Sequence, residues 1–320
     1  MILILTDMND KHADIVCDKL SELNQNFFRF NLDVDSLKKT QITFNDKNWI
    51  INSNNMTINT NDIKSIWARR AFVELTLDEN CNNDVDFKIW RNEWNKTLLG
   101  LYVRLKKCNW LGEIRNSFRG ENKYLQREIA HKIGFIQPMQ IVSNNKEDLI
   151  EFTDKNNDNV VLKLMSQEFY ETEDGFKGLY VNKITKNDLN AFNIKDENPI
   201  VLQEYIDKDY EVRYTVVGDK HFVCKIDSQI SCKTKVDWRR YDITNTPHLE
   251  IKPPNSIKEK VNKLMDELNL NFGALDFVVK KNGDWVFLEI NTMGQWLWIE
   301  TLTGMKISDE ITQLIIANNL

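Results

Sequence analysis

The chain has 320 residues, of which 42% are hydrophobic and 28% are charged, and its formal net charge is −6 at pH 7. This composition is typical of a folded globular protein, and the length accommodates two or three packed units. The negative charge argues against general binding to nucleic acid, and no stretch approaches the roughly 18 apolar residues of a membrane span.

The N-terminus predicts the start of an α/β unit. An apolar run at residues 1–5, a helical pattern at about 11–23 and a second apolar run at 27–30 give the order β-α-β. No basic region precedes the first run, so it is interpreted as a buried strand and not as a signal peptide. Together with five cysteines that form no Cys-x-x-Cys pair, this predicts a cytoplasmic protein with reduced thiols.

The next part of the chain alternates short strand-like runs with Asn-rich turns between residues 41 and 66. A strand at 63–70 ends in Arg69 and Arg70, for which substrate contact and simple ion pairing both stay open. Residues 86–108 have helical periodicity, with several aromatic and aliphatic side chains on or near one face. We find no Gly-rich phosphate loop in this first unit and therefore predict no nucleotide chemistry there.

Positive charge is concentrated between Lys88 and Arg127, which hold ten Lys or Arg and three Glu. Such a basic field attracts anions, either nucleotide phosphates or an acidic peptide. For most of these residues taken singly, a solvated helix face is the simpler interpretation.

Two lysines stand out in the following part of the chain. Lys123 lies at the start of a helix that Gly134 ends, and Lys163 lies within the apolar strand 159–165. Burying an unpaired ammonium is unfavourable, so Lys163 needs either a partner or an edge position that faces water. A long polar segment at 166–178 then separates two strands, as a functional lid would.

The strands at 200–206 and 210–217 carry further polar candidates. Glu211 and Arg213 are two residues apart and therefore project from the same strand face. The Arg213 guanidinium could bind a phosphate or a substrate carboxylate, or it could form an ordinary ion pair with Glu211. The segment 233–242 is basic and aromatic and is too irregular to be a core element.

The strongest pattern is the hairpin expected at residues 272–291. Asn282-Gly283 between two apolar runs predicts a two-residue type I′ turn. Counting back from this turn places Asp276 opposite Glu289, with Cβ atoms roughly 4.5–5.5 Å apart. Like charges so placed destabilise a sheet unless a cation lies between them.

Asn291 projects to the same face as Glu289, which gives a set of oxygen ligands suited to Mg²⁺. The alternative is a pair of exposed acids on a solvated strand, with Leu275, Phe277, Leu288 and Ile290 as the buried side. Because the predicted register places Asp276 directly opposite Glu289, a metal site is favoured.

Leu-Asp-Phe at 275–277, followed by Leu-Glu-Ile-Asn at 288–291, resembles the metal-binding end of the ATP-grasp ligases. The continuation Gly-Gln-Trp-Leu-Trp-Ile-Glu at 294–300 is similar to that of the microviridin-type or graspetide maturases, which cross-link side chains of a ribosomal precursor peptide. One departure from this pattern is Thr292-Met293, where a proline is more usual.

The resemblance implies a role for each candidate residue. Asp276, Glu289 and Asn291 would hold Mg²⁺, and Arg239, then Arg240, would act at the γ-phosphate with Arg213 beside them. Residues of the nucleotide site would contact the phosphates, the adenine and the ribose of ATP. They are Lys123, Lys163, Gln203, Glu204, Tyr205, Ile206 and Glu211.

The implied fold is α/β with α+β subdomains: a pre-ATP-grasp domain at 1–115 and an ATP-grasp core. The core comprises a central subdomain with a nucleotide-covering loop at 116–199 and a C-terminal subdomain with the metal site at 200–320.

The implied function is an ADP-forming ligase with ATP and Mg²⁺ as cofactors. It would activate Asp or Glu side chains of a precursor peptide, with a leader and an acidic core, and join them to Thr or Ser hydroxyls or to Lys amines. Two alternatives stay open, namely a ligase that adds free amino acids to a peptide or protein and a nucleotide-binding regulator without turnover. No nucleic-acid or membrane partner is expected, and both a monomer and a homodimer are compatible with the sequence.

Overall fold

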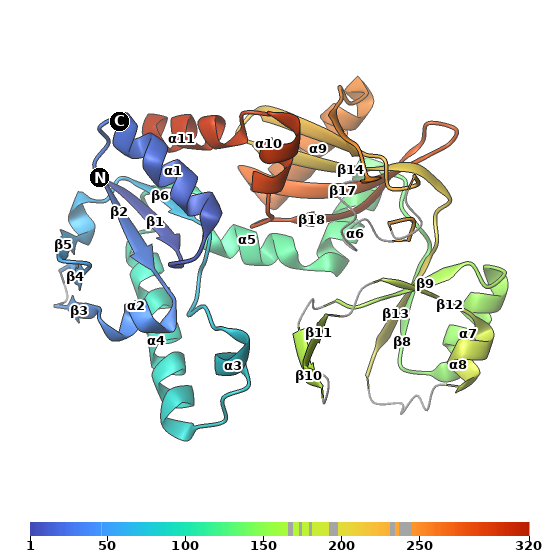
Figure 1. The fold of residues 1–320 in the computed structure, drawn as a ribbon, viewed down its shortest axis with the longest axis horizontal. Coiled ribbons are helices and arrows are strands. Elements are labelled where there is room, and N and C mark those ends of the chain that lie inside the picture. The colour runs from blue at the N-terminus through green and yellow to red at the C-terminus, as the bar shows by residue number, and fades with distance from the viewer. Residues whose placement is uncertain are drawn as a thin grey trace.

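The computed structural model describes residues 1–45, 47–165, 169–172, 175–178, 181–191, 198–230, 234–236 and 245–319. It contains an N-terminal α/β unit, a small central sheet and a larger C-terminal sheet (Figure 1). None of the helices in these ranges is both long enough and apolar enough to cross a bilayer.

The N-terminal unit is built on a parallel sheet of order β2-β1-β6-β7. Its strands are β1 (Ile2–Thr6), β2 (Phe27–Asn31), β6 (Ser65–Ala68) and β7 (Asn109–Leu111). All of β1 is buried because both faces are covered, which explains its uninterrupted apolar sequence. Leu3 and Leu5 pack on the side of α2 (Val34–Lys38) and α4 (Val85–Arg104). Ile2 and Ile4 pack on the side of α1 (Lys11–Glu22) and α11 (Ile307–Ala317).

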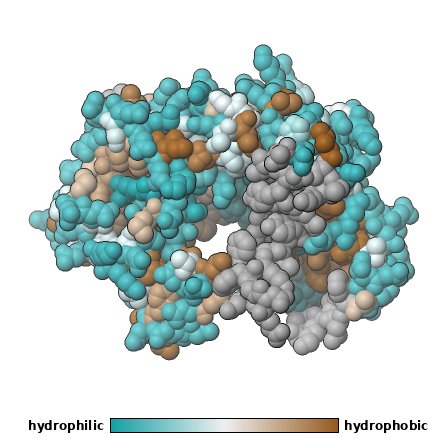
Figure 2. Space-filling model, viewed as in Figure 1, coloured by the Kyte–Doolittle hydropathy of each residue, from teal (hydrophilic) through white to brown (hydrophobic). Residues whose placement is uncertain are grey.

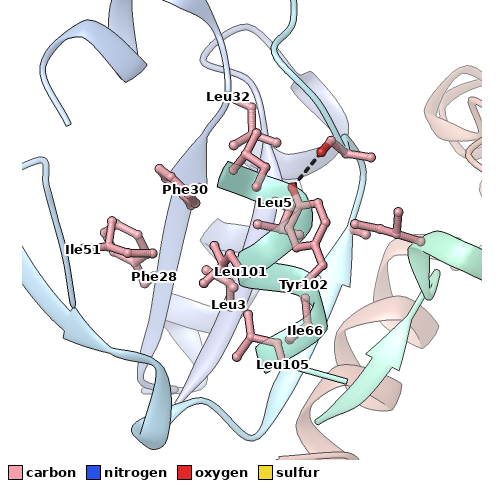
Figure 3. Close-up of a cluster of buried hydrophobic side chains, with 14 of the residues drawn as sticks. Leu3, Leu5, Phe28, Phe30, Leu32, Ile51, Ile66, Leu101, Tyr102 and Leu105 are labelled. Carbon is pink, nitrogen blue, oxygen red and sulfur yellow. Dashed lines mark hydrogen bonds between the residues drawn. The ribbon is translucent and has the colours of Figure 1, made fainter. Parts of the chain in front are cut away.

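The face towards α4 forms a compact core (Figure 3). The Tyr102 hydroxyl there donates to the carbonyl of Ala71 at 2.7 Å, so the one polar group of this aromatic side chain is satisfied. The small meander of β3 (Gln41–Phe44), β4 (Trp49–Ser53) and β5 (Met56–Asn59) lies beside this core, followed by the short helices η1 (Thr60–Asp62) and α3 (Leu77–Asn80). The expected β-α-β start is confirmed.

The central sheet has the order β12-β9-β13-β8, with antiparallel pairing throughout. Its strands are β8 (Gln140–Ser143), β9 (Val160–Lys163), β12 (Asn182–Ile184) and β13 (Ile200–Glu204). Leu149 of α7 (Lys146–Lys155) and Leu189 of α8 (Lys186–Ala191) pack on one face of it. The hairpin of β10 (Phe169–Thr172) and β11 (Gly175–Gly178) lies in the segment expected to form the nucleotide-covering loop.

The C-terminal sheet has the order β16-β15-β14-β17-β18. Its strands are β14 (Lys208–Val217), β15 (Lys220–Ile226), β16 (His248–Glu250), β17 (Phe272–Lys280) and β18 (Trp285–Asn291). Side chains of α6 (Lys123–Ile133) and α9 (Asn255–Leu268) cover one face. The helix α5 (Ile114–Glu121) links the N-terminal unit to this layer, and the chain then returns through α10 (Leu297–Thr303) and α11 (Figure 1).

These contacts correct two of the expected subdomain boundaries. The strand β13 is hydrogen-bonded between β8 and β9, so it belongs to the central sheet and not to the unit expected to begin at residue 200. The helix α6 and most of α5, expected in the central unit from residue 116, pack on the C-terminal sheet. Tertiary packing causes both differences, since each of these elements buries its apolar face against a layer that lies far away in sequence.

The visible face of the molecule is mostly hydrophilic, with hydrophobic side chains in small groups (Figure 2). Several of the exposed apolar residues belong to α4, including Val85, Ile89 and Val103. Isolated apolar groups of this kind are common on protein surfaces.

Candidate active site

The hairpin of β17 and β18 differs from the predicted one at its turn. The Gly283 N–H donates to the Lys280 carbonyl at 2.8 Å, and the Lys280 N–H donates to the Asp284 carbonyl at 2.9 Å. The loop therefore holds three residues, Lys281, Asn282 and Gly283, of which only Gly283 has a positive φ (+89°). The predicted type I′ turn is wrong, and the observed turn is the three-residue form in which a glycine takes the left-handed position.

The predicted pairing of Asp276 with Glu289 is nevertheless confirmed. Phe277 pairs with Phe287, but its neighbour Asp276 pairs with Glu289, so the register shifts by one residue at Leu288. This β-bulge offsets the extra residue of the loop. The two deviations cancel, and counting from a two-residue turn gives the correct partners.

The bulge also changes which side chains face the site. Leu288 was expected on the buried face with Phe277, but it packs with Ile206 and Val278 on the opposite side of the sheet. Leu288 and the adjacent Glu289 both line the same pocket, which regular alternation along a strand would forbid. A bulge redirects side chains in this way and is common beside active sites.

Cations from three other elements surround the two carboxylates. On one side, the Arg213 Nη1 donates to Asp276 Oδ2 at 3.1 Å. On the other side, the Nζ atoms of Lys123 and Lys163 lie 3.6 and 3.9 Å from Glu289 Oε2. These charges offset the repulsion between opposed acids that the sequence predicts. Lys163 is therefore a paired lysine of the site and not a solvated edge residue, and Arg213 pairs across strands with Asp276.

Asn291 completes the set expected to bind metal. Its Nδ2 donates to Asp276 Oδ2 at 3.3 Å, and its Oδ1 accepts from Lys123 Nζ at 3.4 Å. Two carboxylates and an amide oxygen thus converge at the ends of β17 and β18. The set fits Mg²⁺, which prefers oxygen ligands and commonly takes only a few of them from protein. Among the described residues, no group of three or more His, Cys, Asp or Glu is arranged to hold a metal ion.

A pocket extends from these acids between the central and C-terminal sheets. Its lining is mixed, with Asp276, Glu289 and Lys163 among several charged and polar residues and with apolar residues between them. The apolar side chains come from both sheets and from the segments between them: Val161, Val181, Ile206, Val236, Val278 and Leu288. A pocket with apolar walls and several charged groups suits a flat base joined to a sugar and phosphates.

The segment expected to bind adenine lies along this pocket. Gln203, Glu204, Tyr205 and Ile206 all line it, and Gln203 also bonds through Nε2 to Gln140. Glu204 Oε2 accepts from the Met139 N–H at 3.1 Å, so this carboxylate is engaged by the protein's own backbone.

Tyr205 is fixed at both its backbone and its side chain. Its backbone N–H donates to the Asn159 carbonyl at 2.9 Å, and its own carbonyl accepts from Asn159 Nδ2 at 3.0 Å. The Lys183 ammonium lies 3.4 Å from the centre of its ring. Burial raises the pKa of the Tyr205 phenol and lowers the pKa of Lys183.

Glu211, expected to bind the ribose, lines the pocket and is buried. Its Oε1 accepts from Lys208 Nζ at 2.7 Å. Lys208 is not among the residues expected at the site from the sequence, because regular alternation from Glu211 places residue 208 on the opposite strand face. The structure has a bulge between Lys208 and Tyr210, which brings the lysine to the same side.

Arg239 and Arg240, expected at the γ-phosphate, lie outside the described residues. The neighbouring segment 234–236 does reach the pocket, since Val236 lines it and the Val236 carbonyl accepts from Lys208 at 3.1 Å.

The loop after β18 joins the site to the N-terminal unit. A Cβ at Gly294 would lie 2.5 Å from the Ala274 Cβ, so only glycine allows this close approach to β17. Arg69 is buried and donates to the Met293 carbonyl at 3.0 Å and to Asp10 at 3.2 Å. Of the two roles left open for Arg69, ion pairing is therefore the one observed.

Two residues that stand out in the segment 292–300, Thr292 and Trp296, both stabilise the fold. Thr292, which stands where a proline was expected, donates from its N–H and from its hydroxyl to Glu121 of α5. Trp296 is fully buried between the N-terminal and C-terminal units, where its ring meets His12 at 4.8 Å. The tryptophan that helped to suggest the family therefore lies in the core.

Residues 1–117 match the family described as the MvdD pre-ATP grasp domain. A RiPP-associated ATP-grasp ligase of Chryseobacterium gregarium, solved with ADP and with a leader and core peptide, is 28% identical, with 99% of this chain and 96% of that chain covered and a TM-score of 0.86. The macrocyclase MdnB of Microcystis aeruginosa MRC is 27% identical, with 98% of each chain covered and a TM-score of 0.79.

The chain is an ATP-grasp ligase that is similar to the graspetide maturases. The macrocyclase MdnC of Microcystis aeruginosa MRC, solved with the precursor peptide MdnA, has the same fold, with 24% identity, 99% of each chain covered and a TM-score of 0.87. No match was found among curated protein sequences. The ligase thus has the predicted fold, an ATP-grasp core behind a pre-ATP-grasp domain.

Proposed function

We propose that this ligase uses ATP to activate Asp or Glu side chains of a ribosomal precursor peptide and joins them to hydroxyl or amine side chains of the same peptide. The observation that carries this proposal is the convergence of Asp276, Glu289 and Asn291, the first two of which line the pocket between the two sheets. The whole-length similarity to the C. gregarium ligase and to MdnB supports it.

The proposed first step transfers the γ-phosphoryl group of ATP to a carboxylate oxygen of the peptide, which releases ADP and leaves an acyl phosphate. Bound Mg²⁺, held by Asp276, Glu289 and Asn291, would neutralise charge on the phosphates. Lys123 and Lys163 contribute fixed positive charge next to this set, where it is partly shielded from water.

Arg213 has a double task in this scheme. It holds Asp276 through Nη1, and its strand position beside Glu211 directs the guanidinium towards the same pocket. We place Arg239, and then Arg240, at the γ-phosphate in the same step. The Glu211 carboxylate would accept hydrogen bonds from the ribose hydroxyls, and the backbone of residues 203–206 would face the edge of the adenine.

The second step is attack by a Thr or Ser hydroxyl, or by a Lys amine, on the acyl carbon. The carbon–oxygen bond to phosphate breaks, inorganic phosphate leaves and the nucleophile loses its proton. An ester or an amide results, and each bond removes one water from the peptide. The residues of the site do not discriminate between these two products.

The peptide partner would consist of a leader and an acidic core. Within the basic stretch 88–127, Arg115 pairs with Glu113, and Arg119 and Arg127 donate to backbone carbonyls. These residues stabilise the fold, so an acidic peptide would use the others. We keep the surface near Trp90 and Trp94 of α4 as the proposed site for the leader. Trp90 stacks on Phe87, and Trp94 meets Trp90 edge-on.

The test combines mass spectrometry with an assay for ADP. The ligase is incubated with ATP, Mg²⁺ and a short precursor peptide that contains Thr, Lys and Glu or Asp, encoded beside its gene. We expect one water lost and one ADP released for each bond. Mild base should reopen esters and leave amides intact.

A peptide that gains the mass of an amino acid would instead support a ligase that adds free amino acids. Absence of ADP release with every such peptide, while nucleotide still binds, would support a regulator without turnover.

A further inference from the structure

Lys208 is buried, with 5% of its surface exposed. Its Nζ donates to Glu211 Oε1 at 2.7 Å and to the Val236 carbonyl at 3.1 Å. Both charged residues line the nucleotide pocket. Lys208 therefore differs from the paired lysines at the surface, such as Lys132, whose partner Glu128 is also exposed.

A local irregularity of β14 creates this pair. Lys208 lies opposite Lys280, whereas Tyr210 lies opposite Val279, so one extra residue is present on β14 between them. Without it, residues 208 and 211 would project to opposite faces of the strand. The bulge thus turns an ammonium into the pocket where it meets the carboxylate of Glu211.

Burial makes this arrangement energetically demanding. Withdrawing an ammonium and a carboxylate from water costs several kcal/mol for each ion, and their mutual attraction often only offsets that cost. An ion pair so placed contributes little to stability, but it fixes the geometry of both partners. With Oε1 bonded to an ammonium, the carboxylate of Glu211 is held in one orientation towards the pocket.

We propose that Lys208 is a positioning residue that orients the Glu211 carboxylate towards the ribose hydroxyls and thereby makes the ligase selective for ribonucleotides over 2′-deoxyribonucleotides. This inference rests on the proposed function, because it takes Glu211 as the residue that binds the ribose. A carboxylate in a fixed orientation accepts from the 2′-hydroxyl and the 3′-hydroxyl together. One that rotates freely bonds to either hydroxyl alone and distinguishes the two nucleotides poorly.

The experiment compares ATP with 2′-deoxyATP, both by direct binding and by kcat/KM in the ligase assay. The variants are Lys208→Met, Lys208→Arg and Lys208→Met combined with Glu211→Gln. The matched control is Lys225→Met on β15, which removes a lysine paired with Asp227 at 2.8 Å outside the pocket. Thermal unfolding of each variant checks the fold.

We expect the parent enzyme to prefer ATP by about tenfold or more, as the loss of one hydrogen bond to a charged acceptor predicts. Lys208→Met should reduce the preference for ATP to near unity, mainly through KM. Lys208→Arg should restore part of the preference, and Lys225→Met should leave it unchanged. The double variant replaces both charges with neutral groups and should fold even if Lys208→Met does not. It should show the same loss of preference.

An unchanged preference in a folded Lys208→Met or double variant would overturn the role of Lys208. A purely structural role predicts an equal loss for both nucleotides, and that outcome would also overturn it. If the parent protein binds neither ATP nor ADP, the proposed function itself fails, and the two failures are therefore distinguishable.

Discussion

At the scale of single residues, the site contains two carboxylates that face each other, and each of them is paired with a cation. Asp276 and Glu289 face each other across β17 and β18, and Arg213, Lys123 and Lys163 lie against them. Removing one acid would therefore do more than relieve repulsion, because each acid is also the partner of a cation.

We predict that Asp276→Asn and Glu289→Gln each reduce turnover by roughly 10²-fold or more, since each removes a charged oxygen ligand at the developing charge. Stability should also fall, by up to about 3–5 kcal/mol, because each change leaves a largely buried cation without its carboxylate. Steady-state ADP release and urea unfolding measure the two effects. Asp219→Asn in the exposed turn after β14 is the control. Full turnover of either site variant at saturating ATP and Mg²⁺ would refute the metal site.

A second prediction at this scale concerns the base. Both backbone groups of Tyr205 are bonded to Asn159, and the Glu204 N–H donates to the Met139 carbonyl at 2.8 Å. Recognition of adenine would therefore fall to the Glu204 carbonyl and the backbone of Ile206. We expect kcat/KM for GTP to be roughly 10²-fold below that for ATP, as a mismatched hydrogen-bonding edge leaves buried polar groups unsatisfied. Competition between the nucleotides in one assay measures this ratio. Equal use of both would show that the adenine lies elsewhere.

At the scale of elements, irregularities of the strands position the site. The bulge at Leu288 lets two adjacent residues face the pocket, and the bulge before Tyr210 brings Lys208 to Glu211. The acids themselves could be predicted from the sequence, because an apolar alternation and an Asn-Gly turn fix their approximate register. Lys208 and Leu288 could not be placed correctly, because a bulge depends on the twist and packing of neighbouring strands and leaves no pattern in the sequence.

The loop after β18 gives an element-scale prediction. Gly294→Ala would place a methyl group 2.5 Å from the Ala274 Cβ and should displace the chain next to Asn291. We expect a loss of roughly 2 kcal/mol in stability, as overpacking predicts, together with a large loss of turnover.

Gly283→Ala is the matched control, because Gly283 has φ +89° but no atom within 4 Å of an added Cβ. Its cost should be about 1–2 kcal/mol from the left-handed backbone alone, with turnover retained. If both variants lost turnover equally, the close approach at Gly294 would have no special role.

At the scale of the whole molecule, the end of the chain joins the outer units. Trp296 and α11 pack against α1 and the N-terminal sheet, while Arg69 bonds to Asp10 and to the loop after β18. This organisation explains why the sequence predicted the order of the units but not their contacts. Local patterns identify each strand and helix, whereas the layer on which a helix packs depends on residues far away in sequence.

The contact between His12 and Trp296 predicts how stability depends on pH. Burial and the nearby Arg69 together lower the pKa of His12 to about 4, although Asp10 opposes the shift. The folded protein therefore keeps His12 neutral, whereas the unfolded chain binds a proton below a pKa of about 6.5. The unfolded state binds more protons between these two values, so stability is retained above about pH 6.5 and lost as the pH falls towards 4.

We expect this one group to remove about 2 kcal/mol of stability between pH 7.5 and pH 5. His12→Gln should lack this part of the pH dependence, while any effect of Asp10, whose pKa is lowered by Arg69, should appear only at more acidic pH. The measurement is urea unfolding at several pH values for the parent and the variant. Parallel curves for the two proteins from pH 7.5 to pH 5 would show that His12 is accessible to protons in the folded state and that the packing of Trp296 against it is looser than the structure indicates.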